Sequence, residues 1–266
     1  MNGLSVQGII AGYGGDPVIR ELSFTLSRGQ VLGILGANGC GKTTLIKSMC
    51  GILPHRGVCL LDGTDLSRLP PRKAALLCSY IPQRSGITID LPVLEVVLMG
   101  FNPRLGLLEG PNAAMRAQAQ AALAQVGLGG RENDPYHSLS EGQKQLCILA
   151  RTLVSGGSLL LMDEPESALD LHYRHQLLLQ VRHWVQQRNG MAVLSLHDPT
   201  LALNHCDQLL LLKEGACHGM LCPGETPPEE MEALLSGIYG AVNLHRCTDR
   251  TGRQQWVMLK EWEGEE

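Results

Sequence analysis

The chain has 266 residues, which allows one large domain or two small ones and is ample for a buried core. Hydrophobic residues make up 44% of it, which excludes a mainly disordered protein, and a net charge of -4 excludes nucleic acid as a main partner, because no basic surface spans the domain. No apolar run approaches the roughly 18 residues of a membrane span, and the first residues lack the features of a signal peptide, so we predict a soluble chain that is not exported.

Three apolar runs of strand length predict strands that are buried on both faces. They are VLGIL at 31–35, LLLM at 159–162 and AVLSL at 192–196, and segments of helical periodicity alternate with them. Ahead of them, the stretches LSVQGI and LSFTLS flank the turn-rich GYGGDP, which predicts antiparallel hairpin strands. Together these patterns predict an α/β fold with a mainly parallel sheet and an antiparallel N-terminal edge.

Helical patterns dominate between about 86 and 155. One helix there is predicted to begin after the cap Asn112 and to end at Gly127, in the left-handed conformation. The residues that share its apolar face are Met115, Ala119, Ala122, Leu123 and Val126. From about residue 221, the CPGETPP turn introduces an acidic helical and then strand-like tail of about 45 residues.

A glycine-rich segment directly follows the predicted strand at 31–35 and directly precedes a helical pattern. It matches G-x-x-x-x-G-K-[ST], the pattern of a phosphate-binding loop, with Gly36, Ala37, Asn38, Gly39, Cys40, Gly41, Lys42 and Thr43. The glycines let successive backbone N–H groups face phosphate oxygens, Lys42 adds a positive charge, and the Thr43 hydroxyl is a ligand for Mg²⁺. The alternative is a glycine-rich turn with a surface lysine, and the strand-to-helix context favours the phosphate-binding loop.

Two carboxylates, Asp163 and Glu164, follow the predicted strand at 159–162. Carboxylates at the end of a buried strand are costly unless a cation meets them, which favours an Mg²⁺ site. We expect Asp163 to hold the metal through water, and Glu164, which points away from it, to act as general base toward the attacking water. The alternative is an acidic turn after a core strand, which the nearby phosphate-binding loop disfavours.

His197 follows the predicted strand at 192–196. Because ligands bind at the carboxyl ends of parallel strands, we expect the loop at 36–43, Asp163 with Glu164, and His197 to converge at one edge of the sheet. There the ring N–H of His197 could donate to a phosphate oxygen. A histidine taken alone is more often a surface or core residue. The convergence is what favours a functional role.

The segment Ser140–Gln143 is a capping box that predicts the start of a helix with Leu146, Leu149 and Leu153 on one face. Its backbone N–H groups either serve only to begin the helix or also form a second anion site. These residues alone leave the two interpretations equal.

In their chain order, the motifs resemble those of the ATP-binding-cassette (ABC) ATPases, over about residues 4–215. The motifs are Gly36–Thr43, Gln83, Leu139–Gln143, Asp163 with Glu164, Ser167–Asp170, and His197. The resemblance implies a protein that binds and hydrolyses ATP with Mg²⁺. It also implies a head-to-tail homodimer, in which the segment at 139–143 of one subunit binds the γ-phosphate held by the other.

The resemblance also implies roles for single residues. Glu164, His197 and Gln83 would be catalytic, and Thr43, Gln83 and Asp163 would hold Mg²⁺. Tyr13 would stack on adenine, and the less favoured alternative is an ordinary aromatic of the hairpin. The implied nucleotide contacts are Tyr13, Gly36–Thr43, Thr44, Ser140, Gly142 and Gln143.

Within the family, VLEVVLMG at 93–100 with Pro103, and the later SGIYG and TGRQQW, look like ATPase subunits of importers for iron-siderophore, haem or cobalamin. This implies a separate permease with two membrane subunits, an extracytoplasmic substrate-binding protein that acts indirectly, and a peripheral location on the cytoplasmic face of the inner membrane. It implies one nucleotide-binding domain over 1–220, with a helical subdomain at about 86–155 and a short tail, 221–266, packed on it.

We expect the permease to dock on the stretch from Gln83 through Arg104, because it joins the sheet to the helical subdomain. Leu98, Met99 and Phe101 are expected to supply exposed apolar contacts there, although some of them must be core.

The alternative function is a soluble, non-transport ABC ATPase in cofactor assembly or repair. Such a protein would present a basic stripe or a long coiled coil, and the sequence shows neither. A module that binds ATP without turnover is disfavoured by the presence of Glu164 and His197.

Several positions depart from the family pattern. Glu141 stands where glycine is usual, Glu166 where threonine is usual and Cys40 where serine is usual. Leu146 takes the place of a common arginine, and the segment at 100–104 reads GFNPR where GRxPH is usual. Glu141 places a negative charge near an anion site, so we expect weaker or slower closure of the dimer unless its side chain turns away.

Overall fold

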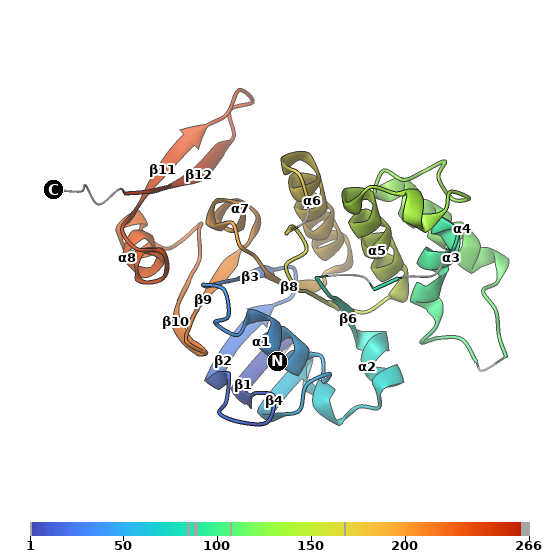
Figure 1. Cartoon of the computed structure of the whole chain (residues 1–266), viewed down its shortest axis with the longest axis horizontal. Coiled ribbons are helices and arrows are strands. Elements are labelled where there is room, and N and C mark those ends of the chain that lie inside the picture. Colours follow the sequence, from blue (N-terminus) through green and yellow to red (C-terminus); the bar gives the residue numbers. More distant parts are fainter. Residues whose placement is uncertain (1, 84–85, 88–89, 107, 168, 262–266) are drawn as a thin grey trace.

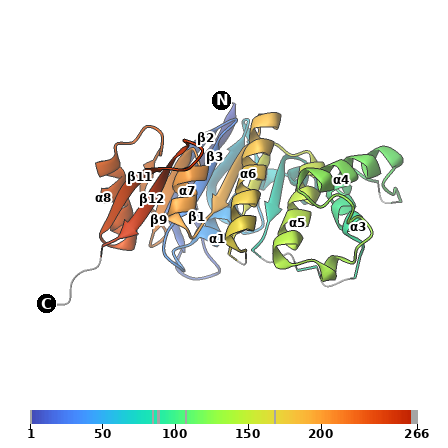
Figure 2. The same cartoon turned by 90° about the horizontal axis from the view of Figure 1, so that it is seen from above.

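The computed structural model describes residues 2–83, 86–87, 90–106, 108–167 and 169–261. Ala168 of the motif Ser167–Asp170 lies outside the described residues, as do parts of the expected docking stretch, helical subdomain and tail. The elements form two sheets with a helix between them, a lobe of helices at one end and a small tail at the other (Figures 1 and 2).

Six strands form the main sheet, in the order β10-β9-β3-β8-β7-β6. They are β3 Val31–Leu35, β6 Cys78–Ile81, β7 Leu159–Met162, β8 Met191–Ser195, β9 Gln208–Lys213 and β10 Ala216–Leu221. All neighbours pair in parallel except β10, which is antiparallel to β9. The predicted α/β fold with a mainly parallel sheet is confirmed, and the three predicted apolar strands are β3, β7 and β8.

The N-terminal strands are antiparallel, as predicted, and they form a second sheet of their own. Its order is β2-β1-β4-β5, with β1 Gly3–Ala11, β2 Ile19–Ser27, β4 His55–Leu61 and β5 Thr64–Asp65. Helix α1, Lys42–Met49, lies between this sheet and the main one, in contact with β1 and β8 (Figure 1).

The main sheet is buried on both faces because side chains alternate along each strand. Leu32 and Ile34 of β3 pack toward α1 and the antiparallel sheet, whereas Val31 and Leu35 pack toward the helices of the opposite face. All four are at most 1% exposed. Burial on both sides is the reason why these strands are continuous apolar runs.

Helices cover the other face of the main sheet and form the lobe. They are α3 Val93–Leu98, α4 Ala113–Gln125, α5 Glu141–Ser155, α6 Leu171–Arg188 and α7 Pro199–His205. The remaining helix next to the sheet, α2 Pro71–Leu77, lies on the α1 side, beside β6 (Figure 1). Helix α4 begins as predicted, since the Asn112 side chain accepts from the Met115 N–H at 2.9 Å, and Gly127 follows it with φ of 82°. Both bonds of the predicted capping box of α5 are present.

The expectation that Leu98 and Phe101 supply an exposed docking surface is wrong. Leu98 is 2% exposed and Phe101 is fully buried, because the turn at 99–101 packs its side chains into the helical lobe. Gly100 lies so close to α5 that a Cβ there would be 2.1 Å from the Arg151 carbonyl oxygen. Arg104 donates to the last carbonyl of α5 at 2.7 Å. The segment at 98–104 therefore packs against α5 inside the helical lobe and does not form an exposed apolar surface.

The tail comprises helix α8, Pro228–Tyr239, and a hairpin of β11, Val242–Thr248, and β12, Gln254–Lys260. The hairpin is joined to α7 through Asn204, which donates to the Trp256 carbonyl and accepts from its N–H, both at 2.8 Å. It lies at the end of the molecule away from the helical lobe (Figure 2). Throughout the described part of the chain, every helix is too short or too polar to cross a bilayer.

Candidate functional site

The phosphate-binding loop connects β3 to α1, and two glycines allow its shape. A Cβ on Gly36 would lie 2.3 Å from the Leu212 carbonyl oxygen. Gly41 has φ of 110° and forms the N-cap of α1, so the positive end of that helix faces the loop. Residues 37–39 are exposed at the tip of the loop, and the Cys40 thiol is buried below it.

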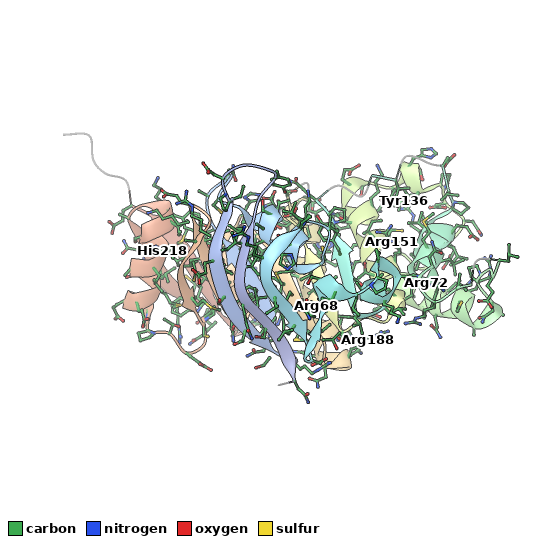
Figure 3. All side chains as sticks on the ribbon, turned by 90° about the horizontal axis from the view of Figure 1, so that it is seen from below. Arg68, Arg72, Tyr136, Arg151, Arg188 and His218 are labelled. Atoms are coloured by element: carbon green, nitrogen blue, oxygen red, sulfur yellow. The ribbon has the colours of Figure 1, made fainter. Side chains whose placement is uncertain are left out.

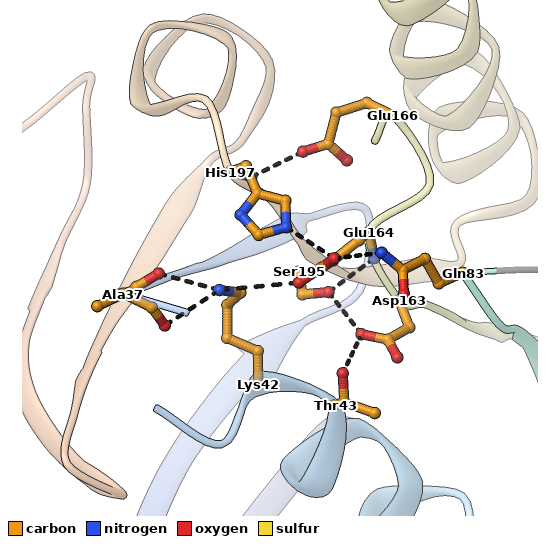
Figure 4. A network of polar contacts seen from close by, with 10 residues as sticks. Ala37, Lys42, Thr43, Gln83, Asp163, Glu164, Glu166, Ser195 and His197 are labelled. Carbon is orange, nitrogen blue, oxygen red and sulfur yellow. Dashed lines mark hydrogen bonds and ion pairs between the residues drawn. The ribbon is translucent and has the colours of Figure 1, made fainter. Parts of the chain in front are cut away.

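Lys42 is held at the centre of the site. Its side chain is 3% exposed, and its ammonium donates to the carbonyls of Gly36 at 2.9 Å and Ala37 at 3.4 Å (Figure 4). The Glu164 carboxylate lies 3.9 Å from the same ammonium. A buried charge with this many partners marks the place where an anionic ligand would be bound most strongly.

Thr43 and Asp163 provide adjacent oxygen ligands. The Thr43 hydroxyl donates to Asp163 Oδ1 at 2.9 Å, and Asp163 is 3% exposed. Magnesium prefers oxygen ligands of these two kinds and completes its shell with phosphate and water. The pair therefore fits an Mg²⁺ ion, although Asp163 alone supplies a negative charge.

Ser195 also belongs to the site, although the sequence motifs did not predict it. Its buried hydroxyl donates to Asp163 Oδ1 at 2.9 Å and accepts from the Glu164 N–H at 2.8 Å. It thereby fixes both carboxylate residues at the end of β7. The signal in the sequence was a single polar residue in the apolar run AVLSL, two positions before His197 and hence on the same side of the strand.

The Glu164 carboxylate contacts the two remaining polar side chains of the site, Gln83 and His197. Its Oε2 lies 2.7 Å from both Gln83 Nε2 and His197 Nε2 (Figure 4). The backbone has φ of 46°, a left-handed conformation that is uncommon for glutamate and that turns its side chain away from that of Asp163. The structure thus brings together Lys42, Gln83, Glu164 and His197, at the carboxyl edge of the sheet.

The Glu166 carboxylate forms a hydrogen bond with the backbone of His197. The residue is 1% exposed, and its Oε1 accepts from the His197 N–H at 2.7 Å. Its Oε2 has no hydrogen-bond partner among the described residues. Burial raises the pKa of this carboxyl, because the charged form loses its hydration.

This raised pKa predicts a dependence of stability on pH. The folded chain holds the Glu166 proton more tightly than the unfolded chain, so the contribution is favourable at low pH and is lost as pH rises through the folded pKa. We expect Glu166→Gln to raise the melting temperature relative to wild type more at pH 8 than at pH 4.5, by about 2–4 °C for each 1 kcal/mol. Calorimetry at both pH values measures this difference, with Glu21→Gln as control, since Glu21 is exposed on β2. An identical difference at both pH values would contradict it.

The capping-box segment at 140–143 lies on the helical lobe, away from the phosphate-binding loop. Hydrogen bonds and ion pairs between the two are absent within the described residues. The Glu141 carboxylate turns to its own helix, where the Lys144 ammonium lies 2.7 Å away. Gly142 packs under Tyr173, since a Cβ there would lie 2.6 Å from the aromatic ring.

Two other predicted contacts differ in accessibility. Tyr13, which follows β1, is 63% exposed and can offer a free ring face. Thr44 is 4% exposed within α1, and its carbonyl accepts from the Ser48 hydroxyl at 2.8 Å. A nucleotide could therefore contact Tyr13 through its side chain, whereas Thr44 can offer little beyond its backbone.

Comparison with known proteins places this geometry in a family. The sequence profile described as ABC transporter matches residues 19–167. The chain is 36% identical over 245 residues to the hemin import ATP-binding protein HmuV of Jannaschia sp. (strain CCS1), covering 89% of this chain and 87% of that protein. It is 37% identical over 249 residues to HmuV of Pseudomonas aeruginosa, covering 91% and 95%.

A solved structure shows the same fold over nearly the whole chain. It is an inward-facing metal-chelate type ABC transporter, whose matching chain superposes with a TM-score of 0.83 at 25% identity. The match covers 98% of this chain and 99% of that one, so the tail is included in it.

Proposed function

Because this chain belongs to the ABC transporter family of ATPases, we propose that it powers the uptake of an iron-siderophore, haem or cobalamin type substrate through a separate permease. The protein is an ATPase, and its partners are membrane permease subunits. The observation that supports this class of cargo is the similarity to hemin import proteins over about nine-tenths of both chains. Within the class, it favours haem.

Binding of ATP rests on the loop and on Lys42. The N–H groups at the start of α1 and the Lys42 ammonium would hold the β- and γ-phosphates, and Tyr13 would stack on the adenine. Thr43 and Asp163 would hold Mg²⁺, which neutralises phosphate charge when bound. The Gln83 amide donates to Glu164 Oε2 at 2.7 Å. A shift of this amide on ATP binding would therefore move the carboxylate of the proposed general base.

Hydrolysis rests on Glu164. Its carboxylate would accept the proton of the water that attacks the γ-phosphorus, while ADP leaves and inorganic phosphate forms. Contacts of 2.7 Å from Gln83 and His197 fix the orientation of this carboxylate. His197 is thereby placed to donate to a γ-phosphate oxygen once Glu164 moves to the water. Glu166 holds the His197 backbone in that position.

The second subunit would contribute the capping-box segment. Ser140 is exposed and lies on the lobe rather than at its own phosphate-binding loop, which supports a head-to-tail homodimer with Ser140, Gly142 and Gln143 on the partner's ATP. Pairing with Lys144 holds the Glu141 carboxylate at its own helix. The repulsion that we expected between the Glu141 carboxylate and the partner's phosphate is therefore reduced.

An apolar groove near Gln83 is the best-supported docking surface for the permease. It has a volume of about 330 Å³ and lies between the end of α1, helix α2 and β6, with Ile52, Leu69, Ala74 and Tyr80 in its lining. The strand β6 ends two residues before Gln83, so an occupant of the groove would press on the segment that carries it. Ile52 is 58% exposed.

Charge around the groove indicates what its occupant is. Arg68 is 81% exposed, and its Nε lies 3.1 Å from Asp65 Oδ2, which offsets part of its charge. Arg72 (Figure 3) holds α2 to the lobe by donating to the Pro103 carbonyl at 2.9 Å. A short amphipathic helix of the permease, apolar toward Ile52 and acidic toward Arg68, matches this surface.

We expect Ile52→Glu to lower co-purification of the permease at least tenfold, because a carboxylate would replace apolar contact at the centre of the interface. ATP binding, measured by calorimetry, should be unchanged. Leu259→Glu is the matched control, since Leu259 is 52% exposed on the tail hairpin. Equal loss in both variants, or no loss in either, would contradict docking at this groove.

Transport itself tests the proposed function. Proteoliposomes that contain the permease and this chain, with the substrate-binding protein supplied on the face opposite the ATPase, should accumulate haem, a ferric siderophore or cobalamin when MgATP is supplied, with haem favoured. ATP hydrolysis that no permease stimulates, together with no uptake of any of the three, would favour the soluble, non-transport alternative.

A further inference from the structure

A second cavity lies at the opposite end of the main-sheet strands from the nucleotide site. It has a volume of about 540 Å³ and is bounded by α7, the start of β9 and the tail hairpin. Gln30 and Asp207, which line it, immediately precede β3 and β9. The phosphate-binding loop follows the other end of β3, so the length of that strand, about 16 Å, separates the two sites.

Three arginines line this cavity: Arg182, Arg246 and Arg253. Arg182 belongs to the wall, because it donates to the His205 carbonyl at 2.7 Å and to Asp207 at 3.3 Å. No ion pair holds Arg246 or Arg253 to an acid in the part of the chain that the structure describes. The remaining acid of the lining, Glu225, is exposed and offsets only part of this charge.

The positive charge of these arginines also affects His205, a buried residue beside the cavity. Burial, and then His175, Arg253 and Arg182, lower the pKa of His205 to about 4. The two guanidinium groups thus act on a buried side chain behind the cavity wall, at the end of α7.

The cavity also has a flat apolar wall. Trp256 is 8% exposed as a residue, and the Arg246 guanidinium covers one face of its ring, 4.4 Å from the ring centroid. Leu203, Cys206 and Pro223 line the cavity beside it. Arg246 stacked in this way keeps its N–H groups free to form paired bonds with carboxylate or phosphate oxygens.

We propose that this cavity binds a small organic anion, whose carboxylate or phosphate groups are held by Arg246 and Arg253 and whose apolar part lies against Trp256. The volume lies within the range of small-molecule sites. The inference does not depend on the proposed cargo or on transport.

An occupant would act on the nucleotide site through α7. The hairpin is bonded to this helix by Asn204 and by Thr200, whose hydroxyl accepts from the Met258 N–H at 3.3 Å. Helix α7 begins at Pro199, two residues after His197. An anion that holds the hairpin to α7 therefore stiffens the segment that follows a proposed catalytic residue.

Calorimetric titration of the whole chain at low ionic strength tests the site, with citrate as the carboxylate probe and inorganic pyrophosphate as the phosphate probe. Saturating ADP occupies the nucleotide site in every experiment. Binding of either probe is expected, and it identifies which acid group the site prefers. The variant Arg246→Gln with Arg253→Gln should bind at least about tenfold more weakly, since it loses two charge-assisted contacts.

Arg250→Gln is the matched control, because Arg250 is exposed in the same hairpin turn and does not line the cavity. It should bind the probes as wild type does, and melting temperatures of all variants establish that the hairpin is folded. Absence of binding by both probes, an unchanged affinity in the double variant, or an equal loss in Arg250→Gln would overturn the proposal.

Discussion

Lys42→Ala is expected to abolish ATP binding and to lower hydrolysis at least about a hundredfold, the effect of removing a fixed charge that faces phosphate. The substitution deletes the only ammonium that the described residues place beside Glu164 and the loop carbonyls. Fluorescent-nucleotide titration and phosphate release, each with the permease present, measure the two effects.

Lys47→Ala is the control for this experiment, because Lys47 lies in the last turn of the same helix and carries the same charge. It should bind and hydrolyse ATP as wild type does. Phosphate release by Lys42→Ala equal to that of wild type would contradict the proposed site.

Glu164→Gln is expected to lower turnover by about 10²- to 10⁴-fold and to trap a homodimer in MgATP. Glutamine retains the shape of the side chain and its contacts with Gln83 and His197, but it cannot accept the proton of the attacking water. Size-exclusion chromatography with and without MgATP measures the dimer, and phosphate release measures turnover.

Two further substitutions at Ser140 test whether the dimer forms through the capping-box segment. Adding Ser140→Arg should prevent the dimer, because the larger side chain would fill the place of the partner's phosphate. Adding Ser140→Ala removes the helix cap, at about 1 kcal/mol, and the hydroxyl contact with the partner's ATP, but it adds no bulk, so it should weaken the dimer without preventing it. Glu21→Gln is the control for Glu164, since Glu21 has the same φ of 46° at an exposed position of β2. A Glu164→Gln protein that stays monomeric at high concentration with MgATP would count against the head-to-tail arrangement.

Local patterns predicted much of the site. The loop at 36–43, Asp163 with Glu164, and His197 each follow a buried apolar run, and parallel pairing of those runs brings their ends together. Ser195 and Glu166 were not predicted as site residues. Ser195 acts through two hydrogen bonds to the end of β7, and Glu166 through one to the residue after β8, and such bonds exist only once β7 and β8 are paired.

The docking surface was misplaced for a related reason. An apolar residue in a short helical segment can face solvent or a neighbouring helix, and the sequence around Phe101 does not distinguish these. Packing against α5 decides it: Gly100 allows the close approach, and Phe101 is buried by it.

The strands, the phosphate-binding loop, the helix caps and the chemistry of the motifs could be predicted from the amino-acid sequence, because these depend on residues that are adjacent or one turn apart. Tertiary structure decided the separate antiparallel sheet, the bonds of Ser195 and Glu166, the burial of Phe101 and the arginine-lined cavity beneath the tail. Each of these depends on contacts between segments far apart in the chain, such as Asn204 with Trp256, and the free energy of such contacts is fixed only by how the elements pack.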